Sequence, residues 1–324
     1  MAKEKFTFAD LFAGIGGMRI AFERAGGECV LTCEINDNAL KTYEYNFPPS
    51  KGHVTVKDVI KLQASDFPSK PGELGVIVAG FPCQPYSIAG LRKGLEDDRG
   101  GEIFTSLLRL LKTVKPKAFL LENVKGIKSH DGGATFKYML EELASQGYHL
   151  KSETLNSKDH ANIPQNRERV FIVGFRSPEA ADRFSFPKPK PLTTTIHDCL
   201  EPGSVDAKYY YDDRYSVSEE IVKQVTKRDT VYQWRRQYVR ENKSNACPTL
   251  TANMGSGGHN VPLVRDSKGV RKLTPRETAN FQGFPSTFKL PAMAPSHLYH
   301  QFGNSVTVPL IERIAKQIAS ALDE

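Results

Sequence analysis

The sequence has few cysteines and no long apolar run, and both absences restrict where the protein can work. The five cysteines, at positions 29, 33, 83, 199 and 247, include no C-x-x-C pair. They therefore indicate neither a disulfide framework nor a four-cysteine zinc site, and reduced thiols fit a cytosol. No run of about 18 apolar residues occurs, and the N-terminus lacks an apolar signal segment. We expect a cytoplasmic protein that binds no metal and enters no membrane.

The composition favours a folded protein with a polyanionic partner. The 324 residues are 39% hydrophobic, which is enough for one large domain or two of ordinary size. Lys and Arg number 44 against 37 Asp and Glu, so the formal net charge is +7 and the pI is near 9.0. A basic balance of this kind is typical of nucleic-acid binders, although a soluble protein can also be basic without binding one.

Short β-rich segments alternate with helix-like stretches up to about residue 175, which predicts an α/β fold with a mostly parallel sheet. The helices end at recognisable stops, such as Gly26-Gly27, Pro116 and Gly147. The predicted strands are 5–12, 28–34, 75–80, 117–122, 148–155 and 169–175, and the clearest helices are 17–25, 103–114, 136–146 and 310–322.

The pattern breaks around residues 185–195, where three prolines and three threonines predict a linker. Residues 196–290 are rich in charge, Tyr, Gly and Pro and show little helical periodicity, so we expect them to be irregular. The amphipathic helix at 310–322 can rejoin the first domain. The sequence therefore predicts a discontinuous large domain, 1–190 plus 299–324, and a smaller domain, 191–298.

The first strand leads into a glycine-rich turn that is suited to a nucleotide. FAGIGG, at 12–17, lies between a strand and a helix, where backbone must approach a ligand closely. Arg19 occupies the position of the third glycine of the dinucleotide fingerprint, which favours a smaller adenosyl ligand. Glu34, at the end of the second strand, can accept hydrogen bonds from both ribose hydroxyls, and Asp58 can contact the adenine amino group. Either feature alone is also common as a plain turn or a helix cap.

A second group of polar residues is expected at the carboxyl edge of the same sheet. A lone cysteine is more often a small buried apolar residue than a nucleophile. Cys83, however, lies in a loop between two prolines, a setting that fits neither helix nor strand core and favours a nucleophile. The next strand ends in Glu122 and Asn123, which we expect at the same edge, beside the Cys83 loop. Further along the chain, QNRERV places Arg167 and Arg169 at the start of another strand. These guanidinium groups can hold a base carbonyl or a phosphate, or they can be ordinary surface arginines.

Together these segments resemble the cytosine-5 DNA methyltransferases of bacterial restriction-modification systems, over nearly the whole chain. The resemblance implies a Rossmann-like methyltransferase domain and a smaller, irregular target-recognition domain, in which only Thr249-Leu250 is recognisable. The motifs that carry it, in chain order, are DLFAGIGG, the acidic Glu34, GFPCQPYS, DDRG at 97–100, LENV, QNRERV, RKLTPRE at 271–277 and QFGNSV at 301–306.

The resemblance also implies a chemistry. The cofactor is S-adenosyl-L-methionine, which leaves as S-adenosyl-L-homocysteine, and the substrate is a cytosine rotated out of duplex DNA. Cys83 adds to carbon 6 because carbon 5 is otherwise a weak nucleophile. Protonated Glu122 hydrogen-bonds ring N3 and the exocyclic amine, and Arg169, with Arg167 beside it, grips O2. The sequence names no base for the carbon 5 proton, and an ordered water is our hypothesis.

The resemblance extends to the residues that contact cofactor and DNA. Asn304 matches the motif that closes the cofactor pocket, and Thr249 matches a position beside the flipped base. The basic, aromatic segment 233–243 and the glycine-rich segment 253–262 are candidates for groove and phosphate contacts, or else a solvated face and a plain turn. We predict that Phe12, Gly14, Ile15, Gly16, Gly17, Glu34, Ile35, Asp58, Val59, Gly80, Pro82, Asn304 and Ser305 bind cofactor. We predict that Gln84, Ser87, Arg99, Arg235, Arg236, Arg240, Thr249, Gly257 and Gly258 bind DNA.

Two alternatives remain open at the level of sequence. An RNA (tRNA) cytosine-5 methyltransferase would share the catalytic loop, but the roughly 100 residues between QNRERV and RKLTPRE fit groove reading of duplex DNA better. A non-catalytic DNA-binding relative is disfavoured by the intact Cys83, Glu122 and Arg169. We therefore expect a monomeric enzyme of the cytosol or nucleoid, with duplex DNA as partner and functional association with a cognate restriction endonuclease.

Overall fold

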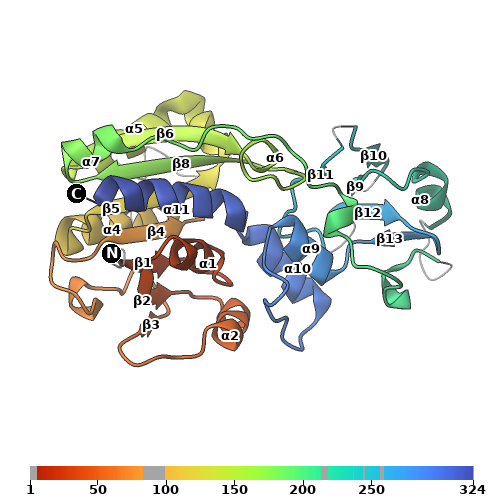
Figure 1. The fold of residues 1–324 in the computed structure, drawn as a ribbon, viewed down its shortest axis with the longest axis horizontal. Coiled ribbons are helices and arrows are strands. Elements are labelled where there is room, and N and C mark those ends of the chain that lie inside the picture. The colour runs from red at the N-terminus through yellow and green to blue at the C-terminus, as the bar shows by residue number, and fades with distance from the viewer. Residues whose placement is uncertain are drawn as a thin grey trace.

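The structure is a computed structural model that describes residues 6–82, 99–212, 218–235, 237–243, 245–255 and 259–323, without the side chains of residues 99, 100 and 259. Figure 1 shows a large lobe around one extended sheet and a smaller lobe at the other end of the molecule, with two helices between them.

The large lobe contains a seven-stranded sheet in the order β3-β2-β1-β4-β5-β8-β6. The neighbouring strands from β3 to β5 are parallel, whereas β8 is antiparallel to both β5 and β6, so β8 alone is reversed. The prediction of a mostly parallel sheet is confirmed, and the six predicted strands agree with the observed ones to within two residues at each end. The strands are β1 (Thr7–Leu11), β2 (Glu28–Cys33), β3 (Val54–Val56), β4 (Val76–Gly80), β5 (Ala118–Val124), β6 (His149–Asn156) and β8 (Glu168–Phe175).

Helices cover both faces of this sheet because its strands alternate apolar side chains between the two sides. On β5, Leu120 packs into the core that contains α1 and α11, and Leu121 into the core that contains α4 and α5. The C-terminal helix α11 contacts α1 and lies across the strands in Figure 1. The helices are α1 (Gly17–Arg24), α2 (Asp37–Asn46), α4 (Arg99–Val114), α5 (Ala134–Ser145), α6 (Ser157–His160), α7 (Pro178–Arg183) and α11 (Val308–Leu322).

The smaller lobe has a sheet and a core of its own. An antiparallel sheet in the order β10-β9-β12-β13 packs with α8 around Trp234 and Leu263. The sequence pattern predicts irregular structure here, and it misses this sheet for physical reasons: the strands are short, and Pro262 lies inside one of them, a residue that normally argues against a strand. The elements are α8 (Ser218–Gln224), β9 (Tyr232–Arg235), β10 (Val239–Glu241), β12 (His259–Arg265) and β13 (Val270–Lys272).

The segment after β13 returns to the core of the large lobe. Helices α9 (Pro275–Phe281) and α10 (Pro295–Asn304) contribute Phe281 and Phe302 to the same apolar cluster as α11. A two-residue parallel pairing joins β11 (Cys247–Pro248) to β7 (Gln165–Asn166). The domain boundaries at 190 and 299 stay a prediction, and the packing indicates that the chain leaves the smaller lobe near Leu273.

A buried ion pair connects the two lobes. The guanidinium of Arg271, on β13, donates through two nitrogens to the two carboxylate oxygens of Glu277, on α9, both at 2.7 Å, and through Nε to Asp266 at 2.7 Å. Arg271 is 2% exposed and Glu277 is fully buried.

We predict that Glu277→Gln lowers the free energy of unfolding by about 3–5 kcal/mol, because it leaves the Arg271 charge buried without its bidentate partner. Urea unfolding measures the loss. Glu219→Gln is the matched control, since Glu219 pairs with Lys223 on the surface of α8 and should change little. Equal stability of the two variants would contradict this account.

Asp10, on β1, is a second buried ionisable residue, with a different consequence. It is fully buried, and neither carboxylate oxygen has a hydrogen-bond partner within the described part of the chain. Burial raises the pKa of Asp10 to about 8, with Arg19 acting in the opposite direction. The folded protein therefore keeps a proton that the unfolded chain releases near pH 4, so this residue makes folding less stable as the pH rises from about 4 to 8.

We predict that Asp10→Asn flattens the pH dependence of stability. Between pH 5 and pH 8 the wild type should lose stability relative to the variant by up to about 1.4 kcal/mol per pH unit. Urea unfolding at both pH values tests this, and parallel curves for the two proteins would show that Asp10 does not hold the proton.

Candidate active site

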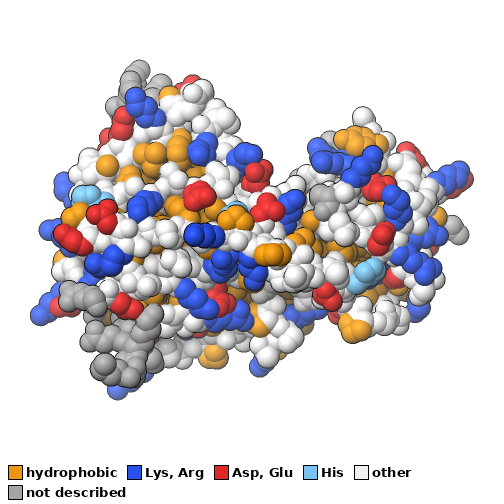
Figure 2. All heavy atoms as spheres, turned by 45° about the horizontal axis from the view of Figure 1, so that its top comes forward, with side chains coloured by type: hydrophobic (Ala, Val, Ile, Leu, Met, Phe, Trp, Pro, Cys, Tyr) orange, Lys and Arg blue, Asp and Glu red, His pale blue; other side chains and the backbone are white. Residues whose placement is uncertain are grey.

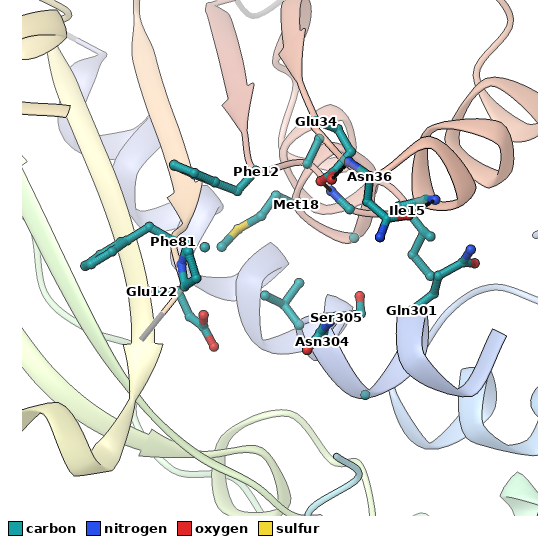
Figure 3. A pocket seen from close by; sticks show the side chains of 18 of the residues that line it. Phe12, Ile15, Met18, Glu34, Asn36, Phe81, Glu122, Gln301, Asn304 and Ser305 are labelled. Carbon is teal, nitrogen blue, oxygen red and sulfur yellow. Dashed lines mark hydrogen bonds between the residues drawn. The ribbon is translucent and has the colours of Figure 1, made fainter. Parts of the chain in front are cut away.

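A cavity of about 390 Å³ opens at the edge of the large sheet where β1, β4 and β5 end. Its lining comes from the glycine turn after β1, the residues that follow β2 and β4, the end of β5, the start of β8, and the end of α10. Figure 3 shows Glu34 and Phe12 on one side of the cavity, Glu122 and Phe81 on another, and Asn304 and Ser305 facing them from α10. Every predicted cofactor residue from β1, β4 and α10 except Gly16 is part of this lining.

The glycine turn is shaped by left-handed backbone and close approach. Gly16 has φ +88°, and a Cβ there would lie 2.3 Å from the Phe47 ring. At Gly17 a Cβ would lie 2.9 Å from the hydroxyl of Ser305. Both positions need glycine, one for its backbone angle and the other so that the end of α10 can touch the start of α1.

Glu34 holds this turn in place. Its Oε2 accepts a hydrogen bond from the Gly14 amide and its Oε1 from the Asn36 amide, both at 2.7 Å. The carboxylate is 9% exposed and lines the cavity. A carboxylate has about four acceptor sites, so Glu34 can still accept hydrogen bonds from a ligand.

A second cavity of about 320 Å³ adjoins the first and shares Phe12, Ile35 and Pro82 with it. Asp58 and Val59, both predicted to contact the cofactor, line this second cavity. Ile35 is a large apolar side chain that is 51% exposed. Apolar side chains around one carboxylate suit a planar base with an amino group, so the two cavities together fit an adenosyl ligand.

Glu122 and Arg169 form an ion pair on the wall of the first cavity. Glu122 pairs in register with Phe171 of β8, so Arg169, two residues earlier, is its diagonal neighbour on the same face. Nε of Arg169 lies 3.1 Å from Oε1 of Glu122, and their side chains are 15% and 11% exposed. Burial lowers the pKa of Arg169, and the Glu122 charge acts in the opposite direction. The pair presents a carboxyl group and a guanidinium to one ligand.

Cys83, Gln84, Ser87, Arg236, Gly257 and Gly258 lie outside the described residues, and so does the side chain of Arg99. The residues just before Cys83 are described. Pro82 lines both cavities, and the Asn123 amide donates to the carbonyl of Phe81 at 3.3 Å. The described start of the Pro-Cys-Gln-Pro loop is therefore held beside the end of β5.

Arg167 has different partners from Arg169, although the sequence places the two together. Its guanidinium is 2% exposed and donates to the backbone carbonyls of Leu250, Gly303 and Ser305. Burial, with the charge of Arg169, holds the pKa of Arg167 well below its ordinary value.

Several lining residues were not predicted from the sequence. Asn36 and Ala39 come from the start of α2, and His300 and Gln301 from α10. Helical spacing could have found His300, because it lies four residues before Asn304 on the same face of one helix.

The described DNA candidates do not line either cavity. Arg235 and Arg240 are exposed on neighbouring strands of the smaller lobe, and the hydroxyl of Thr249 donates to the Asn166 carbonyl at 2.6 Å. Figure 2 shows a hollow between the two lobes with Lys and Arg side chains on both sides.

The described residues contain no group of three or more His, Cys, Asp or Glu side chains arranged to hold a metal ion. None of the described helices is long and apolar enough to cross a membrane.

Solved structures of methyltransferases share this fold. The Entamoeba histolytica methyltransferase EhMeth superimposes with a TM-score of 0.75 at 21% identity, covering 99% of this chain and 100% of that one. The Dnmt2 methyltransferase of S. pombe superimposes with a TM-score of 0.72 at 19% identity, covering the same shares of each chain.

Sequence comparisons place the chain in a family. The chain is 50% identical over 317 residues to the Type II methyltransferase M.Bsp6I of Bacillus sp. (strain RFL6), covering 97% of this chain and 98% of that protein. It is 37% identical to M.HpaII of Haemophilus parainfluenzae, covering 99% and 91%. The sequence model for C-5 cytosine-specific DNA methylases matches residues 6–320. The chain therefore belongs to the family of C-5 cytosine-specific DNA methylases.

Proposed function

We propose that this protein transfers a methyl group from S-adenosyl-L-methionine to carbon 5 of a cytosine in a short duplex DNA site, as the modification enzyme of a Type II restriction-modification system. The observation that carries the proposal is the Glu122–Arg169 pair, which shares one cavity with the residues suited to an adenosyl group. We further propose that the protein acts as a monomer and that a cognate endonuclease cuts the same site.

The cofactor fits the two adjoining cavities. In this proposal Glu34 accepts hydrogen bonds from the ribose hydroxyls, and Asp58 accepts one from the adenine amino group. Phe12 and Ile35 would pack on the base, and Asn304 and Ser305 would close the pocket from α10. When bound, the cofactor would supply an electrophilic methyl group on its sulfonium.

The target base takes the other end of the first cavity. A cytosine rotated out of the duplex presents N3 and its amine to Glu122 and O2 to Arg169, and rotation costs a few kcal/mol. The Cys83 thiolate would form a bond to carbon 6, which moves electrons of the ring double bond onto carbon 5. Carbon 5 would then displace the methyl group from the sulfonium, and S-adenosyl-L-homocysteine would leave with the electron pair of the broken carbon–sulfur bond. Loss of the carbon 5 proton to a base lets the thiolate leave and restores the aromatic ring.

DNA would lie in the hollow between the lobes. Arg235 and Arg240 extend from the smaller lobe, which we propose is the target-recognition domain. Thr249 precedes the backbone carbonyl that Arg167 binds, so a phosphate contact there would lie near the junction of the lobes. The similarity to Type II methyltransferases over nearly the whole chain favours DNA over an RNA substrate.

We predict that DNA from cells expressing the protein carries 5-methylcytosine within one short recurring sequence. Bisulfite or long-read sequencing identifies that sequence, and cells expressing Cys83→Ser provide the background. 5-Methylcytosine that appears in the tRNA of these cells and not in their DNA would contradict the proposed substrate.

We predict that Cys83→Ser lowers methyl transfer to duplex DNA by roughly 10³-fold or more, as removal of a catalytic nucleophile does. Incorporation of labelled methyl into purified DNA measures the rate. Cys199→Ala is the control because Cys199 is buried near α9, away from the cavity lining. Methylation by the serine variant at the wild-type rate would eliminate the thiol mechanism.

We predict that Glu122→Gln lowers the rate of methyl transfer by about 10²–10⁴-fold, because glutamine cannot exchange a proton with the base. Binding of S-adenosyl-L-homocysteine, measured by calorimetry, should stay close to wild type. An unchanged rate would remove Glu122 from the chemistry, and parallel loss of rate and cofactor binding would indicate misfolding instead.

A further inference from the structure

Arg167 lies where three separate parts of the chain meet. It stands between β7 and β8, and its Nη1 donates to the carbonyl of Leu250 at 2.8 Å. Its Nη2 donates to the carbonyls of Ser305 and Gly303, at 2.6 and 3.3 Å. One guanidinium therefore ties the catalytic sheet to the segment after β11 and to the turn after α10.

Burying the charged guanidinium of Arg167 in this way costs free energy of folding, which a residue with only a packing role would not require. Arg167 is 2% exposed, its hydrogen-bond acceptors among the described residues are neutral carbonyls, and Nε is buried without a partner there. The neighbouring charge of Arg169 adds repulsion and lowers the pKa of Arg167 further. A well-packed apolar side chain would fill the same space without burying a charge.

The two segments that Arg167 holds also touch each other directly. A Cβ on Gly303 would lie 2.3 Å from the Thr251 carbonyl carbon and 2.4 Å from the Ala252 nitrogen, so backbone packs on backbone at this point. Gln165 and Gln282 add a second, indirect link. Oε1 of Gln165 accepts from the Leu250 amide at 3.1 Å, and its Nε2 donates to Oε1 of Gln282 at 3.1 Å, while Nε2 of Gln282 donates to the carbonyl of Phe302, the neighbour of Gly303, at 2.7 Å. A shift of either segment must move the other.

Each segment also borders a different ligand of the proposed reaction. Asn304 and Ser305 line the cavity that fits the cofactor. Thr249 is the neighbour of Leu250, and it lies where the chain passes toward the smaller lobe and the proposed DNA surface. The junction thus connects the two binding sites through a few packed backbone groups.

We propose that Arg167 is a positioning residue that couples cofactor binding to DNA binding, by holding the Leu250 and Gly303–Ser305 backbones together instead of contacting the target base. The inference deepens the proposed function and rests on it. Coupling of this kind is reciprocal: cofactor tightens DNA binding by the same factor as DNA tightens cofactor binding, typically about 5- to 150-fold.

The test compares DNA affinity with and without S-adenosyl-L-homocysteine, by fluorescence anisotropy on a duplex that carries the mapped methylation site. We expect the compound to tighten DNA binding of the wild type at least about fivefold. In Arg167→Lys this gain in DNA affinity should fall below about twofold. The three donors of an ammonium leave from one nitrogen, whereas Arg167 bonds Leu250 and Gly303–Ser305 through two separate nitrogens of its planar fork. Calorimetry of the compound with and without DNA should give the same factors.

Arg313→Lys is the matched control. The Arg313 guanidinium also donates to two backbone carbonyls, those of His160 and Lys188, but it lies on α11 away from the cavity lining. This variant should keep the wild-type gain. Gly303→Ala provides a second route to the same outcome, since it separates the backbones of residues 303 and 251 and should also reduce the gain.

The inference is overturned if the wild type shows no gain, or if folded Arg167→Lys keeps the full gain. Should Arg167→Lys fail to fold, an unreduced gain in Gly303→Ala overturns it equally. Failure of the proposed function is distinguishable, because the wild type would then not methylate the duplex at all.

Discussion

The reversal of one strand is the constraint on which the site depends. Because β8 runs antiparallel to β5, its first residues lie at the edge where the other strands of the sheet end. Arg169 thereby becomes the diagonal neighbour of Glu122, and two groups that can hold one pyrimidine lie 3.1 Å apart. A parallel β8 would place Arg169 at the opposite edge, far from the cofactor cavity.

Buried polar groups hold the parts of the molecule around that edge. Gln282, on the turn after α9, donates to the Phe302 carbonyl at 2.7 Å and accepts from Gln165 at 3.1 Å and from Thr307 at 3.2 Å. Low polarity strengthens such bonds but makes each unpaired group costly, so a network of this kind fixes a single arrangement. As a result, β7, the end of α10 and the start of α11 are held in one arrangement around the site.

The sequence predicts most strands of the large lobe but not the antiparallel sheet of the smaller lobe, and particular residues explain the difference. Alternating apolar residues and glycine stops predicted six strands of the main sheet. The reversal of β8, which brings Arg169 to the edge where Glu122 lies, was not predicted. The β10-β9-β12-β13 sheet was not predicted because its strands are short and Pro262 lies inside one of them. The partners of Arg167 are backbone carbonyls, which carry no side-chain signature in a sequence. The assignment of individual residues to cofactor and DNA stays a prediction.

The Cys83 sulfur is the proposed covalent partner of the base, and the most direct test of that role is to locate the bond. A duplex carrying 5-fluorocytosine at the methylated position blocks loss of the carbon 5 substituent, so the adduct persists through proteolysis and mass spectrometry. We predict that the modified nucleotide is found on the peptide that contains Cys83. An adduct on any other residue, or turnover of the fluorinated site without an adduct, would contradict the mechanism.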